Sequence, residues 1–121
     1  MSKKILIVDD SAAIRQMVEA TLKSANYLVT LAKDGQEALD LCSSQRFDFI
    51  LTDQNMPRMD GLTLIKSLRG MSAYMRTPII MLTTEAGEDM KAQGKAVGAT
   101  GWMVKPFDPQ KLLAITAKVL G

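Results

Sequence analysis

The chain has 121 residues, 47% of them apolar and 23% charged, so we expect one globular domain over residues 1–121 without a long disordered tail. Its formal charge of +2 comes from scattered basic residues, which excludes the basic stripe needed to bind nucleic acid. The absence of histidine excludes histidine-based catalytic triads, histidine-ligated zinc and a phosphohistidine carrier, and leaves carboxylate, hydroxyl and amine groups for any chemistry.

Apolar runs of four or five residues alternate with segments of helical period, a pattern typical of a parallel sheet covered by helices. The first run, Ile5–Val8, is unbroken and largely β-branched, as expected of a strand buried on both faces. The run is too short for a signal peptide or a membrane span, so we predict a cytoplasmic protein. A helix follows, with an apolar stripe at helical spacing. The stripe consists of Ile14, Met17, Val18, Thr21 and Leu22.

A second strand is predicted over residues 28–31, and Asp34 and Glu37 then have the spacing of a capping box that opens a second helix. The inward positions of this helix are Ala38, Leu41 and Cys42. Because Cys42 is the single cysteine, it cannot form an internal disulfide, and we expect a buried free thiol. A third apolar strand is predicted over residues 49–53.

The second half of the chain continues the alternation. A loop with proline and glycine over residues 55–61 precedes a third helix, and an apolar fourth strand is predicted over residues 79–82. The inward residues of the third helix are Leu62, Ile65 and Leu68. The fourth helix, from about residue 86 to 97, has the weakest pattern because Gly87 and Gly94 lower helix propensity.

The last strand ends at Val104, and Asp108 followed by Pro109 supplies an N-cap and a first-turn proline for a fifth helix. The inward residues of this helix are Leu112, Leu113, Thr116, Val119 and Leu120. Strand and helix therefore alternate five times, which predicts an α/β fold with a doubly wound, five-stranded parallel sheet and five helices. In such sheets the chemistry lies at the carboxyl ends of the strands.

Polar and reactive side chains directly follow the predicted strands. They are Asp9, Asp10, Asp53, Asn55, Thr83, Thr84 and Lys105. Three carboxylates at one edge repel each other by roughly 4 kcal/mol per pair, at a separation of about 4 Å and an effective dielectric of about 20. They need a counter-cation, and carboxylate oxygens without sulfur or imidazole favour Mg²⁺, with Mn²⁺ as an alternative. A divalent ion and the Lys105 ammonium together balance the three charges.

A carboxylate beside such an ion can attack phosphorus and become an aspartyl phosphate. Thr83 can donate its hydroxyl to a phosphoryl oxygen, and Lys105 can neutralise another. Each residue alone also has an ordinary structural role, such as capping a helix or ending a strand. Together at the strand ends, these residues favour phosphate chemistry.

Short motifs surround these residues in order along the chain. They are Val8-Asp9-Asp10-Ser11, Leu51-Thr52-Asp53, Met56-Pro57-Arg58-Met59-Asp60-Gly61, Leu82-Thr83-Thr84 and Val104-Lys105-Pro106-Phe107. With this set the chain resembles receiver domains of two-component response regulators over essentially its whole length, and it is most similar to the single-domain chemotaxis regulators of the CheY kind. The resemblance implies the flavodoxin-like strand order 2-1-3-4-5.

The resemblance also implies a role for each residue at the strand ends. Asp53 is expected to accept a phosphoryl group from a phosphohistidine on a chemotaxis-type histidine kinase. The expected magnesium ligands are Asp9, Asp10, Asp53 and the main-chain carbonyl of Asn55. The phosphoryl group is expected to contact Thr83, Thr84 and Lys105, and the Lys105-Pro106 peptide bond is expected to be cis. Beyond its own phosphorylation and dephosphorylation, the chain is not expected to be an enzyme.

In receiver domains a switch couples the phosphorylated site to an output face, which the resemblance places on the fourth helix, fifth strand and fifth helix. The implied switch residues are Thr83 and Trp102, where most chemotaxis regulators carry tyrosine. Asn55 and Glu85, together with Gln54, lie where family members tune the lifetime of the phosphoryl group. We expect the chain to be a monomer. Its expected partners are the kinase and either a flagellar motor switch protein or a phosphatase. We expect it to bind neither nucleic acid nor a membrane.

Three alternatives remain open. A phosphorelay shuttle or phosphate sink would keep the receiver fold but lack a motor target, and the sequence does not separate it from a chemotaxis output. A phosphatase of the haloacid dehalogenase type would place its nucleophile after the first strand in an Asp-x-Asp spacing, whereas Asp9 and Asp10 are adjacent. A flavodoxin-like FMN binder would need a Ser/Thr/Gly-rich phosphate loop there, and the two aspartates would repel the anion.

Overall fold

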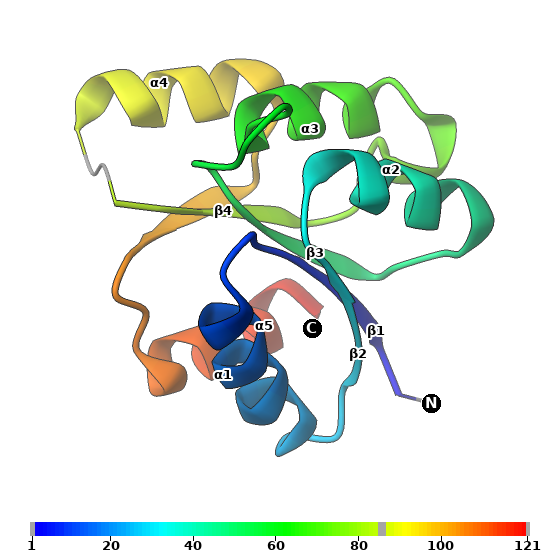
Figure 1. The fold of residues 1–121 in the computed structure, drawn as a ribbon, viewed down its shortest axis with the longest axis vertical. Coiled ribbons are helices and arrows are strands. Elements are labelled where there is room, and N and C mark those ends of the chain that lie inside the picture. The colour runs from blue at the N-terminus through cyan, green and yellow to red at the C-terminus, as the bar shows by residue number, and fades with distance from the viewer. Residues whose placement is uncertain (1, 85–86, 121) are drawn as a thin grey trace.

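The computed structural model describes residues 2–84 and 87–120, and it shows a parallel sheet between two layers of helices (Figure 1). The strands are β1 Lys4–Val8, β2 Leu28–Ala32, β3 Phe49–Asp53, β4 Ile79–Thr83 and β5 Gly101–Val104. The helices are α1 Ala12–Lys23, α2 Gly35–Ser44, α3 Gly61–Arg69, α4 Glu88–Val97 and α5 Pro109–Leu120, with a short 3₁₀ helix, η1, at Ser72–Tyr74. The described strands pair in parallel in the order β2-β1-β3-β4-β5. This confirms the predicted α/β fold and strand order.

Side chains of successive strand residues point alternately into two apolar cores, one on each face of the sheet. In β1, Leu6 and Val8 pack with residues of α2 and α3, whereas Ile5 and Ile7 pack with residues of α1 and α5 on the opposite face (Figure 1). Cys42 lies in the first core as a free thiol, as expected. Because helices cover both faces, the interiors of β1 and β4 are continuously apolar, and the reactive polar groups lie at the strand ends.

Side-chain caps fix where the helices begin. Ser11, Asp34 and Asp60 each accept a hydrogen bond from the backbone N–H three residues further on, at 3.3, 2.8 and 2.8 Å. Asp108, the predicted cap of α5, accepts at 2.9 Å from the N–H two residues on. Each such cap contributes about 1 kcal/mol and so holds the turn that follows its strand. Among the described residues, no helix has both the length and the apolar character needed to cross a bilayer.

The apolar stripe of α1 is narrower than predicted. Val18 and Leu22 are fully buried, but Met17 has 52% of its surface exposed. Successive residues lie 100° apart around a helix axis, so Met17, directly before Val18, falls at the edge of the buried face. The prediction that Met17 points inward was therefore wrong.

A polar hub around Arg69 was not predicted from the sequence. The guanidinium donates to the carbonyls of Tyr74 and Thr77, each at 2.7 Å, and to the carbonyl of Gly98 at 2.9 Å. The buried Tyr74 in turn donates its hydroxyl to the carbonyl of Gln45 at 2.7 Å. The hub therefore ties the end of α3 to the segment before β4 and to the end of α4.

Replacing Arg69 by methionine is expected to lower the free energy of unfolding by about 3 kcal/mol, because three carbonyls lose a charged donor. Urea unfolding followed by circular dichroism measures the loss. Arg76→Met is the matched control, since Arg76 is exposed and makes no hydrogen bond or ion pair within residues 2–84 and 87–120, and it should change stability by less than about 0.5 kcal/mol. Equal losses in the two variants would show that the Arg69 contacts do not stabilise the fold.

Candidate functional site

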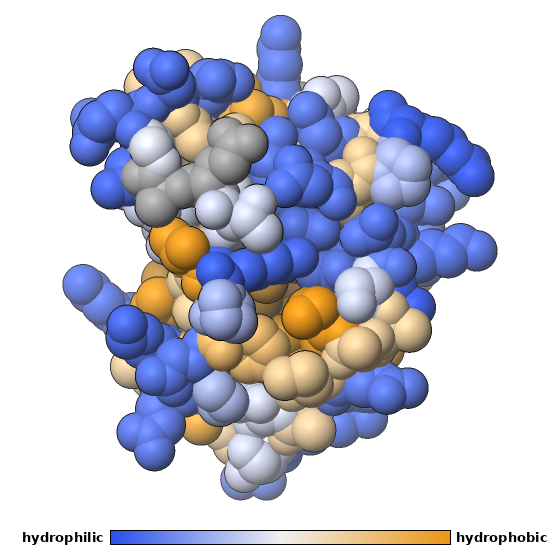
Figure 2. All heavy atoms as spheres, turned by 60° about the vertical axis from the view of Figure 1, so that its left-hand side comes forward, coloured by the Kyte–Doolittle hydropathy of each residue, from blue (hydrophilic) through white to orange (hydrophobic). Residues whose placement is uncertain are grey.

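Three aspartates meet at the carboxyl edge of the sheet, the edge that is turned toward the viewer in Figure 2. Asp9 and Asp10 follow β1 and Asp53 ends β3, and these two strands are neighbours in the sheet. One carboxylate oxygen of each residue lies within 4.8 Å of the others. Asp9 and Asp53 are only 1% and 3% exposed, whereas Asp10 is open to solvent. The structure thus brings together the three carboxylates that the sequence places at strand ends.

Hydrogen bonds hold the turn that follows β1. The N–H of Asp9 donates to the carbonyl of Ala32 at 3.1 Å, and the Arg15 guanidinium donates to the carbonyl of Asp9 at 2.7 Å. Oδ1 of Asp9 accepts from the N–H of Ser11 at 2.9 Å. Its other oxygen, Oδ2, lies 3.3 Å from the Lys105 ammonium but accepts no hydrogen bond from the described residues. A buried carboxylate oxygen without a hydrogen bond suits a hard cation.

One ammonium group lies among the carboxylates. Nζ of Lys105 is 3.1 Å from Oδ1 of Asp53 and 3.3 Å from Oδ2 of Asp9. Burial raises the pKa of Asp53, and the hydrogen bond from Lys105 only partly offsets this rise. Burial acts to lower the pKa of Lys105, but the hydrogen bond to Asp53 and the negative charges of Asp9 and Asp53 outweigh it and raise that pKa. One ammonium against three carboxylates leaves two negative charges for a divalent cation to balance.

Hydroxyl and amide groups complete the surroundings of Asp53. Thr83 ends β4 and is buried, and its carbonyl accepts from the N–H of Lys105 at 2.8 Å. The N–H of Asn55 donates to Oδ1 of Asp53 at 3.4 Å, and its side-chain amide donates to the hydroxyl of Thr84, also at 3.4 Å. The peptide bond from Lys105 to the following proline is cis, as expected. Groups from β3, β4 and the end of β5 therefore converge on one edge.

Gln54 has a role that the sequence did not reveal. Its side chain is buried and turned toward α3, where Oε1 accepts from the N–H of Leu62 at 2.8 Å and Nε2 donates to Asp60 at 3.5 Å. Next to it, a Cβ on Gly61 would lie only 2.6 Å from the carbonyl oxygen of Asp53, so this close approach requires glycine. Gln54 thus helps to anchor α3 against the end of β3, and its expected part in lifetime tuning stays a prediction.

Trp102 lies on the edge strand β5, beside Met81 of β4, with 37% of its surface exposed. The neighbouring Val104 is 43% exposed. A pocket of about 250 Å³ lies between this part of β5 and α5. The switch role of Trp102 stays a prediction, and Glu85, an expected lifetime-tuning residue, lies outside the described residues.

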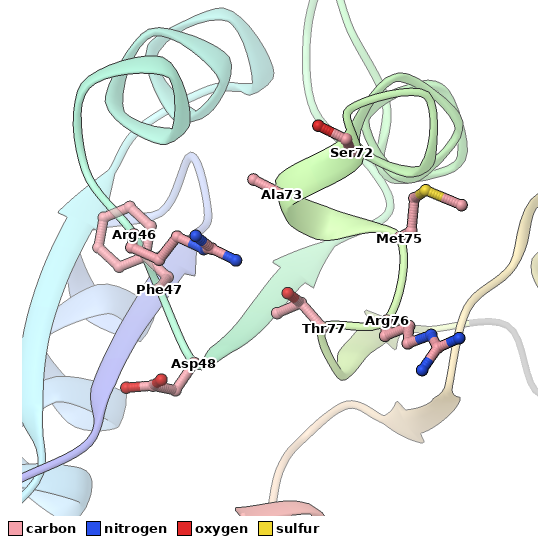
Figure 3. Close-up of a pocket in the computed structure, with 8 residues that line it drawn as sticks. All are labelled: Arg46, Phe47, Asp48, Ser72, Ala73, Met75, Arg76 and Thr77. Carbon is pink, nitrogen blue, oxygen red and sulfur yellow. The ribbon is translucent and has the colours of Figure 1, made fainter.

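A second pocket, of about 490 Å³, lies at the opposite edge of the sheet, where β3 and β4 begin (Figure 3). Its lining residues are Arg46, Phe47, Asp48, Ser72, Ala73, Met75, Arg76 and Thr77. The Asp48 carboxylate accepts from the N–H of Lys4 at 2.8 Å. Because it is the single carboxylate among these lining residues, the pocket lacks the cluster that phosphate chemistry would use at the carboxyl edge.

A family model described as the response regulator receiver domain matches residues 5–117. The chain belongs to the receiver domain family. Receiver domains are signalling modules of two-component systems that work with histidine kinases, and they are not enzymes in the ordinary sense. Membership of this family disfavours both the haloacid dehalogenase and the flavin-binding alternatives.

Curated relatives match this receiver domain over different shares of their own length. The chemotaxis protein CheY of Pseudomonas aeruginosa is 38% identical over 110 residues, which cover 90% of this chain and 89% of that protein. Response regulator MprA of Mycobacterium tuberculosis is 40% identical over 94% of this chain, but the chain spans only 49% of that protein's length. The chain therefore spans about half the length of some of the curated relatives it matches.

Solved structures show the same similarity. The chemotaxis protein CheY4 of Vibrio cholerae has a TM-score of 0.96 and 52% identity, covering 99% of this chain and 100% of that one. The receiver domain of the sensor histidine kinase PA1611 from Pseudomonas aeruginosa has a TM-score of 0.92 and 32% identity, covering 100% and 99% of the two chains. The PA1611 receiver has a magnesium ion coordinated in its active-site cleft.

Proposed function

We propose that this receiver domain accepts a phosphoryl group on Asp53 from a histidine kinase of the chemotaxis type. One observation carries the proposal: Asp53 is buried against both an ammonium group and two further carboxylates. In the reaction, a carboxylate oxygen of Asp53 bonds to phosphorus while the nitrogen–phosphorus bond of the donor breaks, and its electron pair stays on the donor histidine. Because these 121 residues contain no histidine, the donor histidine lies outside this receiver domain.

The carboxylates of Asp9, Asp10 and Asp53 and the main-chain carbonyl of Asn55 would hold Mg²⁺, and Mn²⁺ is the alternative ion for these oxygens. Three observations support the fit: the all-oxygen donor set, the two unbalanced negative charges, and the Asp9 oxygen that accepts no hydrogen bond within the described residues. The magnesium ion of the similar PA1611 receiver supports it as well. When bound, the ion lowers the charge repulsion between the carboxylate and the phosphoryl oxygens.

Side chains at this edge would then receive the phosphoryl group. The Lys105 ammonium, already 3.1 Å from Asp53, would neutralise one phosphoryl oxygen. Thr83 ends the neighbouring strand β4 and Thr84 follows it, and both would donate their hydroxyls to the other phosphoryl oxygens. Asn55 lies beside both the acceptor and Thr84, so it would limit the approach of the water that hydrolyses the product.

Intact-mass measurement after incubation with acetyl phosphate tests this chemistry. In Mg²⁺ the protein should gain the mass of one phosphoryl group, and chelating the metal with EDTA should prevent the gain. If the folded protein stays unmodified in Mg²⁺, the proposed reaction is wrong.

For the output we propose the α4, β5 and α5 face, switched through Thr83 and Trp102, with a flagellar motor switch protein or a phosphatase as partner. Support comes from the two chemotaxis proteins, which match this chain over 89% and 100% of their lengths. The similarity to the PA1611 receiver favours a second candidate, a phosphorelay shuttle or phosphate sink.

A pull-down with beryllofluoride, a mimic of the phosphoryl group, separates the two roles. A chemotaxis output predicts that a motor-switch peptide binds more tightly in beryllofluoride than without it. If the domain is a relay shuttle or phosphate sink, the pull-down should capture phosphotransfer domains. Binding of the motor-switch peptide should then be the same with and without beryllofluoride.

Lys105→Ala is expected to leave phosphoryl uptake partly intact but to uncouple the response, because Asp53 keeps its oxygen nucleophile while the phosphoryl group loses its cation partner. Uptake is measured by intact mass, and the response by the change in fluorescence of Trp102, the single tryptophan, on adding beryllofluoride. Lys66→Ala, an exposed lysine on α3, is the control and should behave like the wild type. A full fluorescence response in Lys105→Ala would contradict the prediction.

A further inference from the structure

The outward face of Trp102 carries a contact that comes from another element. Nζ of Lys91, on α4, lies 5.5 Å from the centroid of the Trp102 ring. Within residues 2–84 and 87–120, this ammonium makes no hydrogen bond or ion pair, although Glu88 and Asp89 share the helix. The ring is therefore the partner that the described part of the chain offers to this cation.

The contact depends on the orientation of the ring. With the ring outward, its π-face is open to a cation from α4, and tryptophan binds cations more strongly than the other aromatic residues. A ring that turned inward would leave the ammonium, and its indole N–H, which has no partner among the described residues, would lose water. We propose that Lys91 is a positioning residue that holds Trp102 outward and sets a threshold for the switch.

The size of the effect follows from the strength of cation–π contacts at exposed sites. The contact is made in one orientation and lost in the other, so its whole free energy biases the equilibrium between them. Removing it should raise the ratio of inward to outward rings by about two- to fivefold. A ligand that favours the inward ring should then act at a concentration lower by about the same factor.

Three variants separate the contact from a simple loss of charge. Lys91→Gln removes the cation, Lys91→Arg keeps a cation that can lie over the ring, and Lys95→Gln removes an exposed charge one turn further along α4. Trp102 is the single tryptophan, so fluorescence reports its orientation directly. Beryllofluoride titrations in Mg²⁺ should show a midpoint about two- to fivefold lower for Lys91→Gln than for the wild type. Lys91→Arg and Lys95→Gln should keep the midpoint of the wild type.

The inference rests on the proposed function for its link to phosphorylation, and one further measurement keeps the two apart. Acrylamide quenching of Trp102 without any phosphoryl donor should be weaker in Lys91→Gln than in the wild type, Lys91→Arg or Lys95→Gln. If no variant takes up phosphate from acetyl phosphate, the proposed function fails, and the quenching comparison still decides the role of Lys91. Equal quenching in all four proteins, or a change in Lys95→Gln as large as that in Lys91→Gln, overturns the positioning role.

Discussion

Replacing Asp53 by asparagine is expected to reduce phosphoryl uptake from acetyl phosphate by at least about a thousandfold, to below detection by intact mass. The amide has the shape of the carboxylate but lacks its nucleophilic oxygen, so no acyl phosphate can form. Radiolabelled donor and intact-mass spectra of wild type and variant provide the comparison.

Asp60→Asn is the matched control for this substitution. Asp60 also lies near the carboxyl edge of the sheet, but its carboxylate accepts from the N–H of Thr63 at 2.8 Å and caps α3. Asparagine is an equally good N-cap, so the variant should fold and take up phosphate like the wild type. Uptake that survives in Asp53→Asn, or is lost equally in Asp60→Asn, would remove Asp53 from its assigned role.

Replacing Asp10 by asparagine is expected to have opposite effects on metal binding and on the stability of the metal-free protein. Affinity for Mg²⁺ should fall more than about tenfold, because one anionic ligand is lost. Without metal, the variant should be more stable than the wild type by about 1 kcal/mol, since one of three clustered carboxylates is neutral. Thermal unfolding over a range of Mg²⁺ concentrations measures both quantities, because an ion that binds only the folded state raises the unfolding temperature.

The raised pKa of Asp53, which burial causes, makes the stability of the metal-free protein depend on pH. A carboxyl whose pKa is higher in the folded than in the unfolded state favours folding when it is protonated, and that contribution is lost as the pH rises through the folded pKa. At neutral pH, the ionised Asp53 carboxylate therefore opposes folding. Asp40→Asn, an exposed charge change on α2, should alter neither the metal response nor the metal-free stability. A Mg²⁺ response in Asp10→Asn identical to that of the wild type would show that Asp10 is not a ligand.

The fold was predictable because strands that are buried on both faces leave continuous apolar runs in the sequence. Ile5–Val8 and the runs at 49–53 and 79–82 all lie within or coincide with strands of the structure. The prediction for Met17 was wrong because a residue at the edge of an apolar stripe can be either buried or exposed. The sequence does not show how far the core extends around α1. Strand order came from family resemblance, since periodicity does not determine how parallel strands are arranged.

The carboxylate cluster was predictable from one rule, that the carboxyl ends of parallel strands meet at one edge. The contacts of Arg69 and Gln54 were not, because their partners are backbone groups, which no residue type in the sequence identifies. The contact between Lys91 and Trp102 joins a helix to an edge strand, and it depends on how α4 lies beside β5. Such pairings become visible only when the packing of the elements is known.

Mapping the phosphorylated residue tests the central claim most directly. The protein is incubated with acetyl phosphate in Mg²⁺, the acyl phosphate is reduced with borohydride, and the digested peptides are sequenced by mass spectrometry. Reduction of a single residue is expected, with homoserine in place of aspartate at Asp53. Modification at Asp9 or Asp10, or no modification of the folded protein in Mg²⁺, would contradict it.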